Sequence, residues 1–237
     1  SKERVVVEDD LTIELVSWTE RGFFVSWIEN STISLGLLDM NGHLERLTDR
    51  DELVLTSSVT LDGEHIATAM GTNAEPLEIY LDGKKITEIA VSYPERKRVR
   101  KERISWKSYD GTEIHGVLNL PEDFDSSKRY PLVVLVHGGP TWTALAAMIT
   151  SSYYPVEQLV SKGVLVLEPN YRGSEGQGRD FRKLNYRNLG IGDYEDVVSG
   201  VDRLIEKGFV DKDLVGVMGW SQGGYISAFC ATYGNRF

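Results

Sequence analysis

Residues 214–230 read Leu214-Val-Gly-Val-Met-Gly-Trp-Ser221-Gln-Gly-Gly-Tyr-Ile-Ser-Ala-Phe-Cys230, and this stretch decides the fold. The apolar run 214–218 predicts a buried strand, and the apolar positions within 225–229 predict a helix directly after it. Between them lies Gly-x-Ser-x-Gly with Ser221 at its centre. In a strand–turn–helix context this motif predicts a nucleophile elbow, a sharp turn that exposes a serine hydroxyl.

The spacing of the motif follows from the shape of such a turn. Side chains two positions before and after Ser221 would collide, and glycine occupies both places, Gly219 and Gly223. The turn leads into a helix, so the backbone N–H of Gln222 lies at a helix N-terminus and is aimed at the place where an oxyanion would form. Ser221 is therefore the candidate nucleophile, and Gln222 is a candidate oxyanion donor.

A second motif lies upstream. Residues 132–136 read Leu-Val-Val-Leu-Val, which predicts a fully buried parallel strand, and His137-Gly138-Gly139-Pro140 follows directly. A bare Gly-x-Ser-x-Gly is expected by chance in roughly one chain of this length in ten. A His-Gly-Gly loop after a central strand is where hydrolases with an elbow keep a second oxyanion donor. We expect that donor to be the N–H of Gly139.

Length and composition exclude several classes of protein. The chain has 237 residues, 41% hydrophobic and 26% charged, as expected for a soluble globular protein. A net charge of −10 argues against a nucleic-acid partner. No apolar run is long enough to span a bilayer, and the N-terminus lacks the apolar core of a signal peptide. The single cysteine, Cys230, predicts a buried structural thiol and a reducing, cytoplasmic location.

The first 92 residues contain a repeat. They predict only short strands, at residues 11–18, 23–29, 33–38, 53–60, 65–70, 77–81 and 85–91. Gly22 and Gly63 are 41 residues apart, and so are Gly42 and Gly83. Four short strands in a period of this length are typical of a β-propeller blade, although two unrelated antiparallel meanders would give a similar pattern. Two blades suggest the end of a longer array.

The second half alternates strands and helices. Residues 95–103 form a charged run that predicts a linker or an edge strand, and residues 104–120 predict a hairpin. Helices are expected from Tyr154 and from Asp193, the latter as an N-cap, with a strand at 164–167 between them. The glycine-punctuated segment 170–178 fits no nucleotide-binding spacing and is interpreted as a loop on the rim of the site. This succession predicts the N-terminal part of an α/β-hydrolase domain, a parallel sheet with helices on both faces.

The motifs together resemble the prolyl oligopeptidase family of serine peptidases, and its acylaminoacyl-peptidase and dipeptidyl-aminopeptidase branch in particular. The resemblance rests on the repeat and on three segments of the second half, His137-Gly-Gly-Pro140, Asn170-Tyr-Arg-Gly-Ser174 and Gly219-Trp-Ser-Gln-Gly-Gly224. It implies that residues 1–92 are two C-terminal propeller blades, 93–103 a charged linker and 104–237 the first part of the catalytic domain. It also implies that Ser221 is the nucleophile and that Gln222 and Gly139 donate to the oxyanion.

One departure from the family pattern concerns the catalytic triad. In this fold the acidic residue and the histidine follow the serine along the chain, but only 16 residues (237 − 221) follow Ser221 and none is Asp, Glu or His. All four histidines precede Ser221. We therefore expect the chain to be a fragment that lacks material at both ends, or one piece of a chain whose other part carries the acidic residue and the histidine.

The sequence predicts a serine peptidase that releases an acylated residue or a dipeptide from short peptides, without metal or other cofactor. An esterase, and an interaction domain that kept the elbow but lost the base, are the alternatives. The expected partners are a peptide substrate and the remaining part of the propeller and hydrolase domain, on a second chain or segment. A homo-oligomer stays open, whereas nucleic acid and membrane are not expected.

Overall fold

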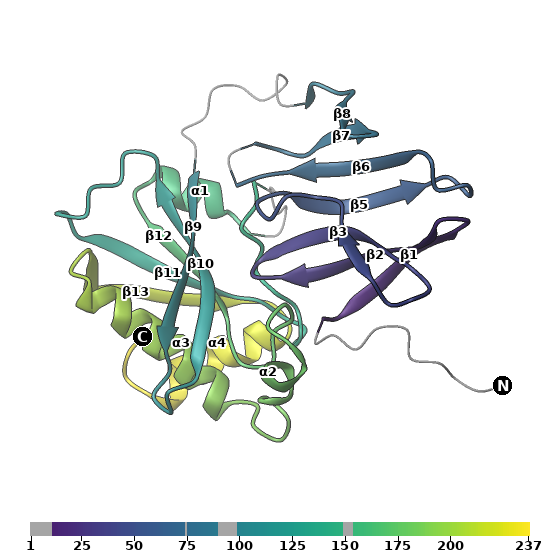
Figure 1. Ribbon diagram of the computed structural model, residues 1–237. Coiled ribbons are helices and arrows are strands. Elements are labelled where there is room, and N and C mark those ends of the chain that lie inside the picture. Colours follow the sequence, from purple (N-terminus) through teal and green to yellow (C-terminus); the bar gives the residue numbers. More distant parts are fainter. Residues whose placement is uncertain (1–10, 74, 90–98, 149–153) are drawn as a thin grey trace. The chain divides into compact units, whose positions relative to one another are not determined.

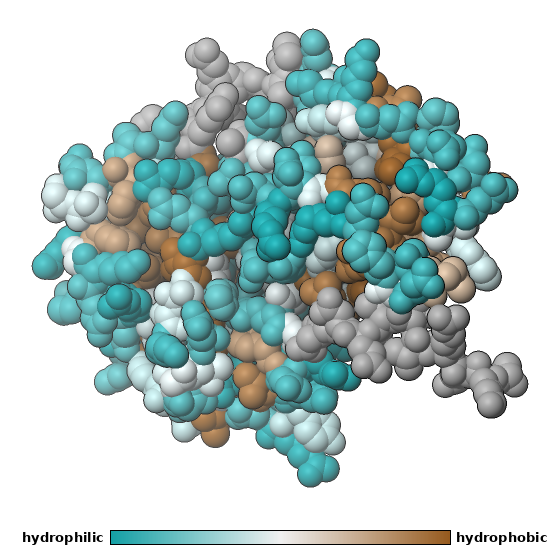
Figure 2. Space-filling view, viewed as in Figure 1, coloured by the Kyte–Doolittle hydropathy of each residue, from teal (hydrophilic) through white to brown (hydrophobic). Residues whose placement is uncertain are grey.

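The computed structural model describes residues 11–73, 75–89, 99–148 and 154–237. The chain forms two compact units. The first comprises Ser1–Glu95, Ala147–Ile149 and Gly176–Arg179, and the second comprises Arg96–Ala146, Thr150–Glu175 and Asp180–Phe237. On the face drawn in Figure 2 the surface is mainly hydrophilic, and hydrophobic residues reach it in separate groups. No helix among the described residues is long and apolar enough to cross a membrane.

The first unit consists of two antiparallel sheets of four strands each, in the orders β1-β2-β3-β4 and β5-β6-β7-β8 (Figure 1). The strands are β1 Ile13–Thr19, β2 Gly22–Glu29, β3 Thr32–Leu38, β4 Leu44–Arg46, β5 Leu53–Val59, β6 Ile66–Gly71, β7 Glu78–Leu81 and β8 Lys84–Lys85. The sheets pack through a shared cluster of buried side chains, Leu35 from one and Val54 and Met70 from the other.

The predicted repeat is visible in this pair of sheets. The first two strands of each sheet pair with a shift in register. The shift falls between Leu15 and Ser17 in the pair β1–β2, and between Val54 and Thr56 in the pair β5–β6. The two expected hairpin glycines, Gly42 and Gly83, both have positive φ, at 88° and 75°.

Two expectations for the first unit were inaccurate. The structure adds β4, which the sequence analysis missed because three residues with one apolar side chain show no clear alternation. The strand expected at 85–91 is confined to β8, and residues 90 and 91 lie outside the described residues.

The second unit is built on a five-stranded sheet in the order β13-β11-β12-β10-β9. Its strands are β9 Val99–Lys107, β10 Glu113–Pro121, β11 Tyr130–Val136, β12 Leu165–Asn170 and β13 Val210–Gly219. β11 is parallel to both β12 and β13, whereas β10 pairs antiparallel with β12 and with β9. The sheet is therefore mixed rather than wholly parallel, because the hairpin expected at 104–120 joins the parallel strands as an edge ribbon.

Helices cover both faces of this sheet, as predicted. They are α1 Val156–Ser161, α2 Arg179–Lys183, α3 Ile191–Glu206 and α4 Gln222–Tyr233. Side chains along β12 point alternately to the two faces of the sheet. Leu165 and Leu167 pack with α3 and α4 on one face, and Val166 packs with α1 on the other. Cys230 is fully buried on α4 and has no disulfide partner, as expected.

The charged segment before the hairpin lies partly in this sheet. Residues 99–103, assigned from the sequence to a charged linker or an edge strand, form the first half of β9 at the edge of the sheet. The remaining residues of that segment, 93–98, lie outside the described residues. An edge strand with charged side chains is poorly suited to pairing with another chain, so the charges protect this edge.

A buried ion pair connects the segment that follows β12 to α3. Arg172, only 5% exposed, donates from Nε and Nη2 to the two carboxylate oxygens of Asp196 at 2.9 and 2.7 Å, and its backbone N–H donates to the same carboxylate at 2.8 Å. Asp110 accepts a further bond from Arg172 at 3.0 Å. The hydrogen bonds that Arg172 donates to Asp196 raise the pKa of the guanidinium, so Arg172 stays charged and this buried charge needs its partner.

We expect Asp196→Ala to destabilise the protein by about 3–5 kcal/mol, because it leaves a buried guanidinium short of its principal partner. The matched control is Asp180→Ala, which removes an almost fully exposed carboxylate 4.0 Å from Lys183 and should cost less than about 1 kcal/mol. The midpoint of guanidinium-induced unfolding measures both effects. Equal shifts in the two variants would show that the Arg172 pair does not stabilise the fold.

Candidate active site

The three sequence motifs meet at one edge of the central sheet. β11, β12 and β13 are parallel neighbours, so their carboxyl ends lie together, and Val136 at the end of β11 pairs in register with Gly219 at the end of β13. The His-Gly-Gly-Pro loop follows β11, the 171–174 segment follows β12, and the serine turn follows β13. Ligands of open α/β sheets bind at this edge, at the carboxyl ends of the strands.

Ser221 has the backbone conformation of a strained turn. Its φ and ψ are 55° and −122°, outside the regions that residues with a Cβ normally adopt. It is exposed, and it is the N-cap of α4. No hydrogen bond to the Ser221 hydroxyl is found among the described residues. Ser221 is therefore exposed at the N-terminus of α4, with its hydroxyl available for reaction.

The two flanking glycines are required by close backbone contacts. A Cβ added to Gly219 would lie 2.5 Å from the carbonyl of Gly223 and 2.6 Å from the carbonyl oxygen of Val136. A Cβ on Gly223 would lie 1.9 Å from that same oxygen. Real Cβ contacts are never so short, so any side chain at either position would push the turn away from β11. The steric reason inferred from the spacing is therefore present, with β11 as the main obstacle.

The expected oxyanion donors belong to the two segments that meet at Ser221, the start of α4 and the His-Gly-Gly loop. Gln222 is the first residue of α4, so the helix itself cannot satisfy its N–H. A Cβ on Gly138 would lie 3.1 Å from Ser221 Cβ and 3.7 Å from Oγ, which places the His-Gly-Gly loop directly against the serine. Gly139 has a φ of 130°, a conformation that favours glycine, and a Cβ there would lie 2.5 Å from the Thr141 nitrogen and 2.6 Å from the Trp142 nitrogen.

The side chain of His137 anchors the His-Gly-Gly loop by hydrogen bonds and by stacking. Its Nδ1 lies 2.8 Å from the Gly138 carbonyl oxygen, and its Nε2 lies 2.9 Å from Ser174 Oγ. The imidazole stacks on Tyr171 with centroids 4.4 Å apart, and the Tyr171 hydroxyl donates to the His137 carbonyl oxygen at 2.9 Å. Burial lowers the pKa of His137 to about 4, so the ring is neutral at pH 7. Both ring nitrogens are engaged, which leaves this histidine unsuited to act as a base for Ser221.

Tyr171 and Ser174 were not singled out as site residues by the sequence analysis, which used the segment 170–174 for the resemblance and interpreted 170–178 as a rim loop. The signal that could have found them is their position directly after a buried strand, beside the strand that carries the His-Gly-Gly loop.

Asp193, in the first turn of α3, is fully buried next to the start of α4. Its carboxylate accepts the backbone N–H of Gly190 at 2.8 Å, and the side-chain amide of Gln222 lies 3.5 Å away. Burial raises the pKa of this carboxyl. The sequence analysis expected Asp193 to be the N-cap, but α3 begins two residues earlier with Gly190 as its cap. Asp193 is the third helical residue and bonds back to the cap, the reciprocal half of a capping box.

The remaining histidines divide between the two units, and the one in the second unit, His115, lies away from Ser221. His43 and His65 belong to the first unit, where His65 pairs with Asp82 at 2.8 Å. His115 lies on β10, opposite Asn170 and three strands from β13, roughly 14 Å at the usual strand spacing. Within the described part of the chain, no group of three or more His, Cys, Asp or Glu side chains could hold a metal ion.

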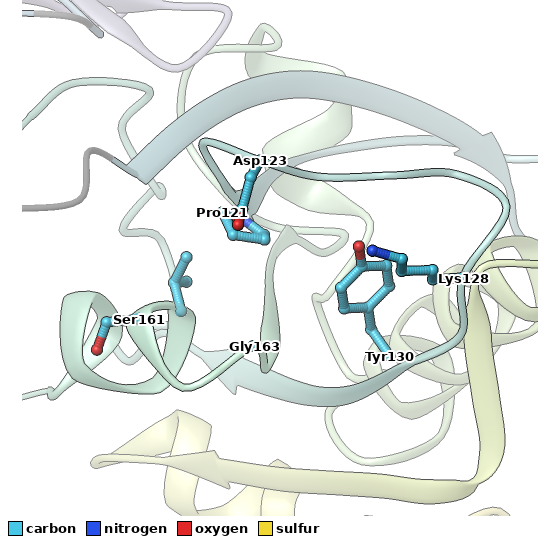
Figure 3. A pocket seen from close by; sticks show the side chains of 7 residues that line it. Pro121, Asp123, Lys128, Tyr130, Ser161 and Gly163 are labelled. Carbon is cyan, nitrogen blue, oxygen red and sulfur yellow. The ribbon is translucent and has the colours of Figure 1, made fainter.

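The structure also contains a pocket that is distinct from this site. Its volume is about 200 Å³, and it is lined by Pro121, Asp123, Lys128, Tyr130, Val160, Ser161 and Gly163, all but Val160 labelled in Figure 3. Tyr130 begins β11, whereas the His-Gly-Gly loop follows the end of that strand, roughly 20 Å away along seven residues. The pocket therefore lies at the edge of the sheet opposite Ser221.

Comparison with known proteins agrees with these motifs. Residues 151–237 match the sequence profile of the prolyl oligopeptidase family. Prolyl endopeptidase FAP of Bos taurus is 30% identical over 168 residues, which are 67% of this chain and 22% of that protein. Dipeptidyl peptidase 8 of Homo sapiens is 33% identical over 128 residues, 53% of this chain and 14% of that protein.

Among solved structures, an acylaminoacyl peptidase in complex with Z-Gly-Gly-Phe-chloromethyl ketone matches with a TM-score of 0.81 at 23% identity. The match covers 96% of this chain and 36% of that one, and it shows that both units share the fold of the corresponding region. The chain thus spans between 14% and 36% of the length of these three proteins. Through residues 151–237 the chain belongs to the prolyl oligopeptidase family of serine peptidases, the family that its motifs resemble.

Proposed function

We propose that this chain carries the nucleophile and the oxyanion donors of a serine peptidase that cleaves short peptides near their N-terminus. Ser221 is the nucleophile, and the backbone N–H groups of Gln222 and Gly139 bind the oxyanion. The observation that carries the proposal is the exposed hydroxyl of Ser221 on a turn with a φ of 55°, against the His-Gly-Gly loop.

The chemistry follows from this placement. Ser221 Oγ attacks the carbonyl carbon of the scissile peptide bond while its proton passes to a general base. The carbonyl oxygen gains the negative charge and accepts the N–H groups of Gln222 and Gly139. When the tetrahedral intermediate collapses, the base returns the proton to the leaving amine and an acyl-enzyme remains, which water then hydrolyses. Because both nitrogens of His137 are engaged, the base and its acidic partner come from another part of the protein.

The same proposal assigns a role to the first unit. We interpret residues 1–92, which contain the two four-stranded sheets, as C-terminal blades of a β-propeller, and residues 104–237 as the N-terminal part of an α/β-hydrolase domain, with 93–103 as the linker in sequence. The repeated sheet topology and the likeness to the acylaminoacyl peptidase fold support this division. In this proposal the propeller restricts the substrate to short peptides, which fits release of an acylated residue or a dipeptide.

The partners of the site follow from its chemistry. The substrate is a peptide, no cofactor takes part in the steps above, and the remaining propeller and hydrolase segments complete the site. A cytoplasmic location is consistent with the single Cys230, which is buried and unpaired.

A fluorophosphonate probe tests the proposal on the full-length protein. We expect one adduct, mapped by mass spectrometry to Ser221, and its loss in Ser221→Ala. The matched control is Ser227→Ala, which removes a hydroxyl on the same helix that donates to the Gly223 carbonyl instead. The Ser227→Ala protein should label as the wild type does.

Substrates then separate peptidase from esterase activity. Two kinds of peptide anilide are assayed, one with an acetylated N-terminus and one with a free N-terminus. An ester of the same acyl group is assayed in parallel. Cleavage of either anilide, abolished in Ser221→Ala, is the expected result. Labelling at another residue, or hydrolysis of the ester alone, would contradict the proposal.

A further inference from the structure

The second unit exposes two of its three tryptophans, and both adjoin the serine turn. Trp106 is 5% exposed, whereas Trp142 is 53% and Trp220 is 77% exposed. Tryptophan is usually largely buried, and exposed indoles are concentrated at contact surfaces. Trp220 directly precedes Ser221, and Trp142 lies two residues after Pro140 in the loop that follows β11. Their exposure therefore marks the rim of this site.

The backbone on both sides of Trp142 is fixed. The Thr141 carbonyl oxygen accepts the Glu175 N–H at 3.0 Å. On the other side, Ala144 exchanges two hydrogen bonds with the side chain of Asn170, at 2.6 and 3.3 Å. Thr143 and Ala144 are only 1% and 7% exposed. Trp142 is thus an exposed indole between anchored neighbours, so little conformational freedom of its backbone is lost when something binds to it.

Trp142 also lies beside the expected oxyanion donor. A Cβ on Gly139 would be 3.3 Å from Trp142 Cβ, and a Cβ on the preceding Gly138 would be 3.1 Å from Ser221 Cβ. Two glycines therefore separate the indole from the nucleophile. An extended peptide advances about 3.4 Å per residue, so a side chain next to the scissile bond is within reach of an indole at this position.

The chemistry of the indole selects the ligand. Its faces are apolar and large, and residues 137–147 that surround it in the sequence contain no Asp, Glu, Lys or Arg. Such a surface binds an aliphatic or aromatic side chain favourably and contributes little binding free energy for glycine or for a charged side chain.

We propose that Trp142 is a specificity-determining residue that contacts a bulky apolar side chain next to the scissile bond of the peptide substrate. The inference rests on the proposed function and adds a substrate class to it. The same apolar side chain could lie on the acyl side or on the leaving-group side of the bond, and the arms of the test separate these two positions.

The test compares Trp142→Ala and Trp142→Phe in the full-length protein, with Trp18→Ala as the control. Trp18 is 70% exposed and belongs to β1 in the first unit. One peptide series carries Gly, Ala, Leu or Phe on the acyl side, and a second carries them on the leaving-group side. In one of the two series we expect Trp142→Ala to lower kcat/KM about 10- to 100-fold for Leu and Phe and less than about threefold for Gly. Trp142→Phe should recover most of the loss, and Trp18→Ala should change nothing.

Binding of a non-cleavable analogue separates this inference from the proposed function. Reduced-amide peptides with Phe or Gly at the selected position bind without chemistry, so their Kd reports the contact even if no peptide is turned over. A tenfold or larger loss of affinity in Trp142→Ala for the Phe analogue alone supports the inference. Equal effects on the Gly and Phe analogues, or none, would overturn it. Failure of the wild type to label at Ser221 would instead contradict the proposed function.

Discussion

Gly223→Ala is expected to reduce kcat/KM on the order of 10³-fold or more and to lower the midpoint of unfolding. The new Cβ would lie 1.9 Å from the Val136 carbonyl oxygen, which belongs to β11, an interior strand that cannot move without disturbing its neighbours β13 and β12. The start of α4 would therefore shift, carrying Ser221 and the Gln222 N–H out of line with the His-Gly-Gly loop. A displacement of about 1 Å in a catalytic group is enough to cost about 100-fold, and loss of an oxyanion donor adds a comparable factor.

The neighbouring glycine supplies the control. A Cβ on Gly224 would lie 3.4 Å from the Gly219 carbonyl oxygen, an ordinary contact. Gly224→Ala should leave kcat/KM nearly unchanged and stabilise α4 by up to about 1 kcal/mol, since alanine is the better helix former. Steady-state kinetics and chemical unfolding of both variants provide the comparison. If Gly223→Ala were as active as Gly224→Ala, the contact with β11 would not hold the serine turn.

Substitutions of His137 should separate the contributions that its two hydrogen bonds make to kcat. A peptide unit is planar, so the imidazole that donates to the Gly138 carbonyl oxygen also fixes the direction of the Gly139 N–H on the same unit. His137→Asn keeps a donor near the position of Nδ1, whereas His137→Gln keeps only one near Nε2. We expect kcat to fall about 10²- to 10³-fold in His137→Gln with little change in KM, and to fall less in His137→Asn.

Ser174→Ala completes this series, because it removes the partner of Nε2 and leaves the bond to Gly138 in place. Its effect on kcat should be closer to that of His137→Asn. Thermal unfolding of all three variants shows whether they remain folded. Equal losses of kcat in His137→Asn and His137→Gln would mean that the imidazole only fills space, and a loss confined to KM would place it in substrate binding.

The features predicted from the sequence are those specified by residues close together along the chain. The strand–turn–helix around Ser221 was predicted because a turn this tight needs glycine at positions 219 and 223 whatever surrounds it. The buried strands β11 and β12 were predicted because strands covered on both faces are continuously apolar. The 41-residue repeat was visible because hairpins need glycine at fixed places.

The features that were missed depend on contacts between distant segments. Ser174 forms a hydrogen bond with His137 only because β12 lies next to β11. The Asp193 carboxylate accepts the backbone N–H of Gly190 because Gly190, and not Asp193, is the N-cap of α3. Short α2 and β4 carry no periodic signal of their own. The antiparallel addition of β9 and β10 to the parallel strands is a matter of strand order, which composition does not encode.

The central claim is that Ser221 stands beside two free amides arranged for an oxyanion. A crystal structure of the full-length protein with a peptidyl phosphonate bound at this site tests it most directly. We predict a bond from phosphorus to Ser221 Oγ and a phosphonyl oxygen 2.7–3.1 Å from the nitrogens of both Gln222 and Gly139. An adduct on another residue, or a phosphonyl oxygen turned away from both amides, would contradict the account.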